Sequence, residues 1–227
     1  MKSTLFEKTE NTSEEHKHFV MQNPHMLLVN LDGSVLAKQG SMAAYQGNID
    51  FKFHGGGVGR FVKKVLTGES LPLMECSGQG DLFLADNGSE VYVIELENEQ
   101  LSINGSNLLS FESSLRWDIN RIKAGVMGFV AGGGIFNITL TGSGNAALTS
   151  FGQPVVLKID QPTRVDVGCL IAWTTNLQTK MVSTMKAGAL VGRGSGEAFQ
   201  MEFNGEGFVV VQPGEGPVAL AMAANMR

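Results

Sequence analysis

The chain has 227 residues, of which 43% are hydrophobic and 17% are charged, and its formal net charge is −5. This length fits one or two domains, and an acidic chain does not attract phosphate backbones over its whole surface, so nonspecific nucleic-acid binding is not expected. Glycine makes up 29 of the 227 residues, roughly twice the usual share of about 7%, which indicates many tight turns. Few charges and many glycines together predict much surface hidden from water, as in a homo-oligomer.

The N-terminal segment is polar. The stretch MKSTLFEKTENTSEEHKHFV has charges throughout and lacks the apolar core of about 7–15 residues that a secretory signal requires. Residues 1–25 are therefore predicted to be a leader, flexible or partly helical, before one β-domain over residues 26–227. His16, His18 and His25 lie in or near this leader without a partner cysteine or an acidic cluster, so no metal site is expected.

A Gly-x-Gly pattern occurs three times along the chain. The copies are GESLPLMECSGQGDLFLADNG from Gly68, GGGIFNITLTGSGNAALTSFG from Gly132 and GEGFVVVQPGEGPVALAMA from Gly205. In each copy, short apolar runs flank the pair of glycines, and such runs bounded by turn residues are typical of β-strands. Hairpin turns at positive φ favour glycine. The sequence therefore predicts hairpin turns at these glycines: Gly78, Gly80, Gly142, Gly144, Gly214 and Gly216.

A second element also recurs, as KQGSMAAYQGNI, INGSNLLSFESSL and DVGCLIAWTTNL. In each copy a glycine precedes small or apolar residues and one aromatic: Tyr45, Phe111 or Trp173. Aromatic side chains at equivalent places in repeats are large apolar anchors, so these three are predicted to lie in the core, with a stacking platform for a ligand as the alternative.

The order of the two elements predicts three similar units. Two complete units cover about residues 68–131 and 132–204, and residues 26–67 together with 205–227 form the third. If the termini meet, the units close around a pseudo-threefold axis, which protects strand edges from aggregation. The segments SEVYVIELENEQLSI and QPVVLKIDQPTRVDV read as further strands, and no long amphipathic helix follows residue 20. The predicted fold class is all-β, with triplicated units like a double-stranded β-helix.

Two motifs imitate other classes of protein. ITLTGSGNAA resembles a dinucleotide fingerprint, but Gly152 and Pro154 follow where a helix is needed, so this class is excluded. The stretch from Ala124 to Leu140 is apolar, but it is shorter than the roughly 20 residues that span a membrane. A barrel interior is the favoured interpretation of that stretch, and attachment to a membrane surface is the alternative.

No catalytic residue or cofactor is expected, because no known nucleophile, metalloprotease or phosphate-loop motif occurs. Cys76 and Cys169 each lie in an apolar run and are predicted to be buried, reduced thiols of a cytoplasmic protein. Cations beside glycine-rich stretches can hold an anion. A candidate patch for an anion or a partner therefore consists of Arg60, Lys63, Lys64 and Arg193, with a solvated loop as the alternative.

The glycine signatures, in their order, resemble a known family. GSMAAYQGNIDF, GGVGRFVKKVLTGESLPLMECSGQGDLFLAD, GGGIFNITLTGSGNAALTSFG, VDVGCLIAWTTNL and GEGFVVVQPGEGPV are similar to the altered-inheritance-of-mitochondria family, from about Val29 to Leu220. The resemblance implies a triplicated β-domain related to the tryptophan RNA-binding attenuator protein. Mitochondrial members are associated with inner-membrane organisation, and bacterial members have no established biochemical activity. No catalytic residues are agreed for the family, so none is transferred.

The expected function is that of a non-enzymatic scaffold or interaction protein. It would form a cytoplasmic homo-oligomer and present a β surface to a protein partner or a membrane-associated complex. The alternative is a binding module for RNA or a small anionic ligand, although the net charge of −5 counts against RNA. An enzyme of unknown class is the third interpretation, and it would need a cleft with perturbed titratable groups.

Overall fold

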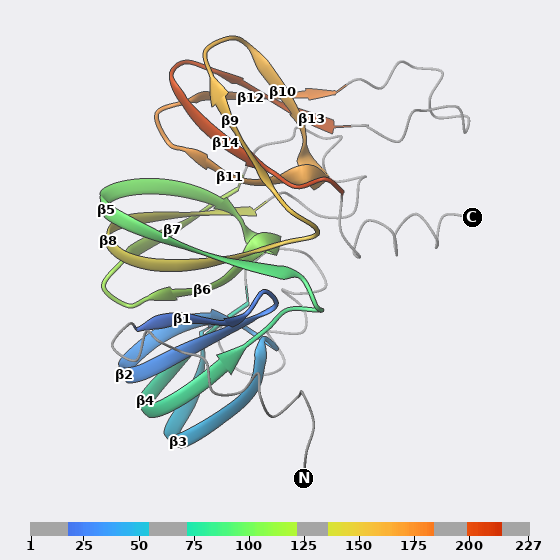
Figure 1. Ribbon diagram of the computed structural model, residues 1–227. Helices are drawn as coiled ribbons and strands as arrows, with labels where there is room; N and C mark the ends of the chain where they lie inside the picture. The colour runs from blue at the N-terminus through green and yellow to red at the C-terminus, as the bar shows by residue number, and fades with distance from the viewer. Residues whose placement is uncertain (1–17, 55–71, 122–135, 184–198, 215–227) are drawn as a thin grey trace.

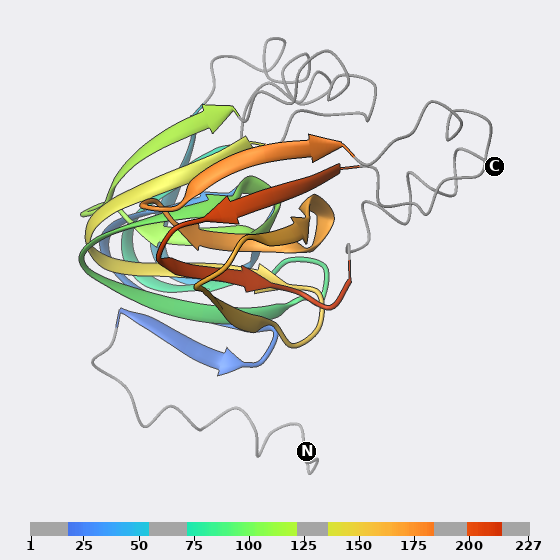
Figure 2. The ribbon, with the colours of Figure 1, turned by 90° about the horizontal axis from the view of Figure 1, so that it is seen from above.

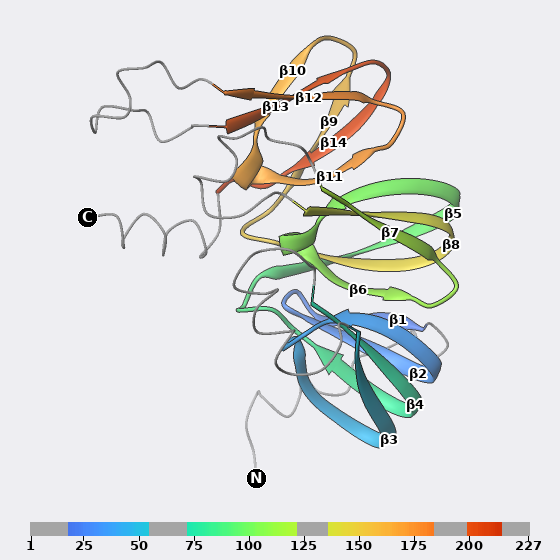
Figure 3. The ribbon, with the colours of Figure 1, turned by 180° about the vertical axis from the view of Figure 1, so that it is seen from behind.

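The computed structural model describes residues 18–54, 72–121, 136–183 and 199–214. These residues form antiparallel β-strands and two short 3-10 turns, so the predicted all-β class is confirmed. No helix longer than a 3-10 turn occurs in these four ranges, as predicted. Figures 1 and 3 show the strands stacked in three groups, which we call the lower, middle and upper layers.

Each layer is a run of consecutive strands. The lower layer contains β1 (Phe19–Asn23), β2 (Met26–Lys38), β3 (Met42–His54) and β4 (Leu73–Leu84). The middle layer contains β5 (Glu90–Asn104), β6 (Leu108–Glu112), β7 (Arg116–Arg121) and β8 (Phe136–Ser150). The upper layer contains β9 (Val155–Ile159), β10 (Thr163–Asp166), β11 (Leu170–Thr174), β12 (Gln178–Ser183), β13 (Phe199–Asn204) and β14 (Gly207–Val211).

Hydrogen-bonded pairing crosses the boundaries between layers. Nine strands of the larger sheet follow the order β3-β4-β2-β6-β8-β5-β11-β14-β9, while β1 pairs with β2 and β7 pairs with β8. A separate sheet has the order β10-β13-β12. Figure 2, seen along the stack, shows the long strands curving around the same side of the molecule. Among the described strands, β3 and β9 are thus the two ends of the main sheet.

The pairing groups the terminal strands differently from the predicted units. β14 pairs with β9 and β11, whereas β2 and β3 both pair with β4. No described strand before residue 54 pairs with one after residue 199. Residues 19–23, placed in the leader by the sequence, form β1 and pair with β2.

The glycine pairs have the predicted backbone conformation but not the predicted position. φ is +139° at Gly78 and +142° at Gly80, and it is +127° at Gly142 and +150° at Gly144. Each pair nevertheless lies inside one long strand, β4 or β8, so the prediction of hairpin turns is wrong there. The flanking apolar runs form a single bent strand because its neighbours continue the ladder past the bend, with Gly33 and Ile49 both paired to Gly78.

The third glycine pair lies at the end of the described chain. Gly214 follows β14 in a bend, and Gly216 lies outside the described residues. The dinucleotide interpretation fails as expected, because β8 continues to Ser150 where that fold needs a helix. Of the apolar stretch 124–140, residues 136–140 belong to β8 and the rest lies outside the described residues.

Two parts of the chain share an order of elements. In the first part, the bent strand β4 with its two glycines comes before the 3-10 turn η1 (Gly105–Asn107). In the second part, the bent strand β8 comes before the 3-10 turn η3 (Val167–Cys169). Each turn is capped by a side-chain oxygen that accepts from the backbone N–H two residues later, and the capping residues are Asn104 and Asp166. A five-residue strand and a six-residue strand follow in both parts.

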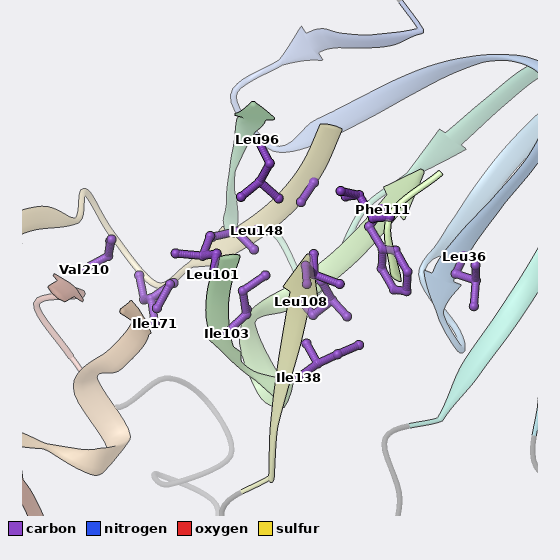
Figure 4. Close-up of a cluster of buried hydrophobic side chains, with 14 of the residues drawn as sticks. Leu36, Leu96, Leu101, Ile103, Leu108, Phe111, Ile138, Leu148, Ile171 and Val210 are labelled. Carbon is purple, nitrogen blue, oxygen red and sulfur yellow. The ribbon is translucent and has the colours of Figure 1, made fainter. Parts of the chain in front are cut away.

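The buried apolar side chains form three clusters. One lies in the lower layer around Leu27 and Cys76, and one in the upper layer around Trp173 and Phe203. The central cluster belongs to the middle layer but also includes two buried side chains from the lower layer and three from the upper layer. Figure 4 labels Leu36 from β2, Ile171 from β11 and Val210 from β14 among them. This shared core holds the layers together by burial of apolar surface.

The predicted aromatic anchors differ in their burial. Phe111 is fully buried, and Trp173 is only 4% exposed, which confirms both as core residues. Tyr45 is 47% exposed, so its predicted place in the core is wrong. Its strand β3 ends the main sheet and has a neighbour on one side only, and the Tyr45 ring packs edge-on against Phe51.

Candidate functional site

The predicted cation patch cannot be placed, because Arg60, Lys63, Lys64 and Arg193 lie outside the described residues. Of the two cysteines, Cys76 is fully buried, as predicted, and Cys169 is half-buried. Burial, together with the charge of Glu75, raises the pKa of the Cys76 thiol to about 11. A thiol that stays protonated is a poor nucleophile, so Cys76 is a core residue.

The strand edge at β9 is unusually apolar. Val155 is 56% exposed, Val156 is 66% exposed and Leu157 is 37% exposed, although they are consecutive residues whose side chains alternate between the two faces. Phe151, just before this strand, is also exposed. Within β9 only Lys158 carries a charge. Natural edge strands are usually protected by charges, so an apolar edge indicates a surface that is covered by pairing.

The opposite edge, β3, is exposed but more polar. Phe53 is 68% exposed, and Met42 is also exposed. Polar or charged side chains lie between them along the strand, at Gln46, Asn48, Asp50 and Lys52. The two ends of the sheet are therefore unequal, and β9 is the better candidate for contact with another chain.

A cleft of about 510 Å³ lies between the middle and upper layers. Its floor belongs to β5, β7 and β8, and its other wall belongs to β11, β12, β13 and the turn before β12. The lining residues are Gln100, Ser102, Asn120, Asn137, Thr139, Trp173, Thr175, Leu177, Thr179, Lys180, Met181 and Met201. This volume falls in the usual range for small-molecule sites, about 300–1,000 Å³.

The floor of the cleft is a polar face of a sheet. In β8, Ile138 and Leu140 point into the central core, so the alternation of a strand places Asn137, Thr139 and Thr141 on the other face. The registers of β5 and β7 with β8 add polar neighbours on both sides. Across β5, β8 and β7 the rows are Gln100–Thr141–Arg116, Ser102–Thr139–Asp118 and Asn104–Asn137–Asn120.

Hydrogen bonds connect this polar face. The Asn120 side-chain amide donates to Thr139 Oγ1 over 3.2 Å, and Thr139 Oγ1 and Ser102 Oγ lie 3.1 Å apart. The Asn137 amide donates to the same Ser102 Oγ over 3.1 Å. Asn137 is only 5% exposed, and its Oδ1 atom has no hydrogen-bond partner among the described residues. Buried polar atoms without partners are rare and call for an explanation.

The facing wall combines apolar and polar side chains. Trp173 and Met201 are 4% and 0% exposed, while the half-buried Met181 and the exposed Thr179 and Lys180 reach its surface. Lys180 stands opposite Glu202 in the register of β12 and β13. A hydrogen bond from Arg164 is the main cause that lowers the pKa of Glu202, and the charges of Arg164 and Lys180 add to it. The Glu202 carboxylate is thus shared between Lys180 and Arg164, with which it forms an ion pair over 2.8 Å.

A second hollow of about 360 Å³ continues from the cleft along β7. The two hollows share Gln100, Asn120 and Thr139. The second one adds the 38% exposed Trp117 and the charged pair Arg116 and Asp118. Together they form one groove with a polar floor.

A half-buried carboxylate connects the lower and middle layers. Glu112 Oε1 accepts from His18 Nδ1 over 2.7 Å, and Oε2 accepts from the Asn145 backbone N–H over 2.9 Å. Burial raises the pKa of Glu112, but the two hydrogen bonds from Asn145 and the one from His18 outweigh it, so the pKa lies below its ordinary value. His18 was expected only to be a leader residue, and the sequence gives no sign of its partner 94 residues away.

The sequence did carry a signal for the cleft. The segments QLSIN, RWDIN and NITLT alternate polar and apolar residues, which is typical of strands with one polar face. The sequence does not show that these three faces lie side by side. In the described ranges no group of three His, Cys, Asp or Glu side chains could hold a metal ion. The same ranges contain no helix that is long and apolar enough to cross a membrane.

The fold and these sites define an all-β protein whose accessible features are an apolar strand edge and a polar cleft. The chain belongs to the mitochondrial biogenesis AIM24 family, whose model matches residues 19–214, so the resemblance stated from the sequence is confirmed. An X-ray crystal structure of a protein from Streptococcus pyogenes is similar, with a TM-score of 0.71 and 24% sequence identity over 92% of this chain and 95% of that one. This likeness shows the fold alone. No curated protein matches the chain.

Proposed function

We propose that this protein is a non-enzymatic interaction protein that works in the cytoplasm as a homo-oligomer. The observation that supports the proposal best is the apolar edge at β9, where Val155, Val156 and Leu157 are exposed at the end of the main sheet. The occupant we propose for this edge is the β9 strand of a second copy. Membership in a mitochondrial biogenesis family supports a role in assembly, with a protein partner or a membrane-associated complex bound to the rest of the surface.

A twofold axis gives this contact a simple geometry. Two antiparallel β9 strands centred on Leu157 would place Val155 opposite Ile159 and Val156 opposite Lys158. The same surface then serves both copies, as in most homodimers. Backbone N–H and C=O groups at the edge would pair, and the exposed valines and Phe151 would leave water.

The proposal extends to the origin of the fold. We infer that the layers derive from a triplicated unit like those of the attenuator protein. The glycine pairs in the bent strands β4 and β8 and the matching capped turns η1 and η3 support this inference. A chain of repeated units stacks neighbours to bury a continuous core, which fits the shared central cluster.

Native mass spectrometry of the intact protein tests the assembly. We expect the wild type at a multiple of the 24.3 kDa chain mass. Val156→Lys should shift the protein to the single-chain mass, because a charge on an edge strand opposes pairing. Phe53→Lys is the matched control, since Phe53 is equally exposed but lies on the β3 edge, and this variant should keep the wild-type mass.

Three results would contradict the β9 contact. The first is a wild type that is a single chain. The second is an oligomer that survives Val156→Lys, and the third is an oligomer that is lost equally in both variants. Circular dichroism of each variant confirms that the strands are intact.

A further inference from the structure

We propose that the cleft between the middle and upper layers is a binding site for a neutral, polyhydroxylated small molecule, such as a sugar or a cyclic polyol. The inference does not depend on the proposed assembly, because no cleft residue belongs to β9. It stands on three observations: an amide oxygen without a partner among the described residues, a polar floor joined by hydrogen bonds, and a facing wall that is apolar in part.

The unpartnered amide indicates a hydrogen bond that the protein itself does not complete. Asn137 lines the cleft and is 5% exposed. Its Nδ2 donates to Ser102 Oγ, while its Oδ1 has no hydrogen-bond partner within the described ranges. A buried acceptor without a partner costs free energy. The last torsion of an asparagine side chain is soft. A small turn of the amide would let Oδ1 accept from a hydroxyl in the cleft.

The rest of the floor suits hydroxyl groups in particular. Ser102, Thr139 and Asn120 are joined in one chain of hydrogen bonds, so their positions are set before a ligand enters. At the rim, the Thr175 hydroxyl donates a hydrogen bond across the cleft to Gln100 Oε1 over 3.1 Å. Hydroxyls and amides both donate and accept, and so do the hydroxyls of a polyol. Such groups on neighbouring strands can match the hydroxyls around a ring.

The facing wall suits the other side of the same ring. Met181 is the half-buried apolar side chain at this wall, and Trp173 and Met201, which are 4% and 0% exposed, support it from the upper core. A thioether side chain can pack against the C–H face of a sugar, while the hydroxyl edge faces polar groups. Ligand sites commonly combine apolar walls with a few placed polar groups.

The acceptor on the floor of the cleft favours a neutral hydroxyl ligand over an anion. Asn137 Oδ1 needs a donor, which a hydroxyl supplies and an ionised carboxylate does not. Among the described residues that line the cleft, only Lys180 carries a charge. Glu202 stands opposite Lys180 on the neighbouring strand, but its carboxylate forms an ion pair with Arg164 over 2.8 Å. The proposed ligand therefore differs from the small anionic ligand that the sequence left as an alternative.

Saturation-transfer difference NMR on the intact wild-type protein tests the ligand class. The probes are glucose, N-acetylglucosamine, maltose and myo-inositol, with inorganic phosphate and citrate in competition. At least one neutral probe should bind with a dissociation constant at or below about 1 mM, and neither anion should displace it. If no neutral probe binds, or if the anions compete, the proposal is overturned.

Four variants locate the binding. Asn137→Leu should lower the affinity for the probe by at least about tenfold. Lys180→Gln should change that affinity by less than about threefold. Thr139→Val keeps the side-chain volume but removes one hydroxyl of the floor, so it should also weaken binding of the probe. This variant replaces Asn137→Leu in the test if Asn137→Leu fails to fold. Thr163→Val makes the same change at a hydroxyl outside the cleft, bonded to Gln161, and should have no effect.

The variants also separate a ligand role from a structural one. If Asn137 only supports the fold, Asn137→Leu lowers the melting temperature and leaves binding intact. A ligand role predicts that Asn137→Leu weakens binding and changes the melting temperature little. The reason is that the Asn137 side chain makes one hydrogen bond within the described residues and leaves its Oδ1 without a partner there. Binding that survives both Asn137→Leu and Thr139→Val would overturn the proposal, as would binding that is lost in Lys180→Gln.

Discussion

The glycine pair of β4 and the glycine pair of β8 share a sequence pattern and a backbone conformation, but their surroundings differ. At β4, a Cβ added to Gly80 would lie 2.0 Å from the backbone oxygen of Gln46, and one on Gly78 would lie 2.1 Å from that of Asn48. At β8, a Cβ on Gly142 would meet nothing closer than Leu115 at 3.7 Å. The pattern determines the bend, whereas the neighbouring strand determines whether a side chain could fit there.

The difference follows from the pairing at each bend. At its two glycines β4 is paired with both β2 and β3, and Gly47 of β3 pairs with Gly80. Among the described strands, β8 is paired at Gly142 and Gly144 with β5 alone. The second glycine of β8, Gly144, faces side-chain ends instead: a Cβ there would lie 2.6 Å from Ser114 Oγ and 2.7 Å from Glu112 Oε2. Side chains can move aside more readily than backbone.

The largest effect is expected at β4. Gly80→Ala should destabilise the protein by about 3–5 kcal/mol, because the new methyl group clashes with backbone and the positive φ resists a side chain. Gly142→Ala is the matched control, with the same backbone penalty and no clash, and should cost about 1–2 kcal/mol. Urea denaturation measures both. Equal costs would mean that the surroundings of the two bends do not differ as described.

An intermediate effect is expected at Gly144. Gly144→Ala should cost about 2–3 kcal/mol, because its methyl group pushes Glu112 away from the Asn145 backbone N–H. In a Glu112→Ala background the same substitution should cost about 1 kcal/mol less, which a double-mutant cycle measures. Additive costs would show that Glu112 does not fill the space beside Gly144.

The smallest effect concerns pH. The pKa of Glu112 is lowered in the folded protein, so its stabilising contribution is present above its unfolded pKa of about 4.3 and is lost as pH falls through the folded value. Glu112→Gln should therefore have a lower free energy of unfolding than the wild type near neutral pH. The difference between the two free energies should become smaller below about pH 4. His18 is the titratable group that faces Glu112. Denaturation curves at several pH values check the trend, and a gap that widens in acid would contradict it.

The two bends also show what sequence could predict. Positive φ at Gly78 and Gly142 follows from glycine itself, and the apolar runs around them correctly predict strands. Whether such a run folds back or bends depends on strands far away in the chain, such as β2 and β3 beside β4, and no local pattern contains that information. The predicted hairpins were wrong for this reason.

The same limit applies to the candidate sites. The alternation of Asn137, Ile138, Thr139 and Leu140 predicts a strand with one polar face. The alternation does not show that Asn137 Oδ1 lacks a hydrogen-bond partner among the described residues. That feature is visible only in the folded structure, where the upper layer covers this face. Tyr45 and Trp173 occupy equivalent places in their repeats, yet one lies on an end strand and the other between two neighbours. Burial of an aromatic residue here depends on strand position in the sheet.

The shared central cluster has a consequence for how the protein can be divided. Leu36 from the lower layer and Val210 from the upper layer are both buried in the core of the middle layer. A fragment cut between layers would expose one of these side chains to water and leave a hole where it had packed. The outer layers are thus poor candidates for independent modules.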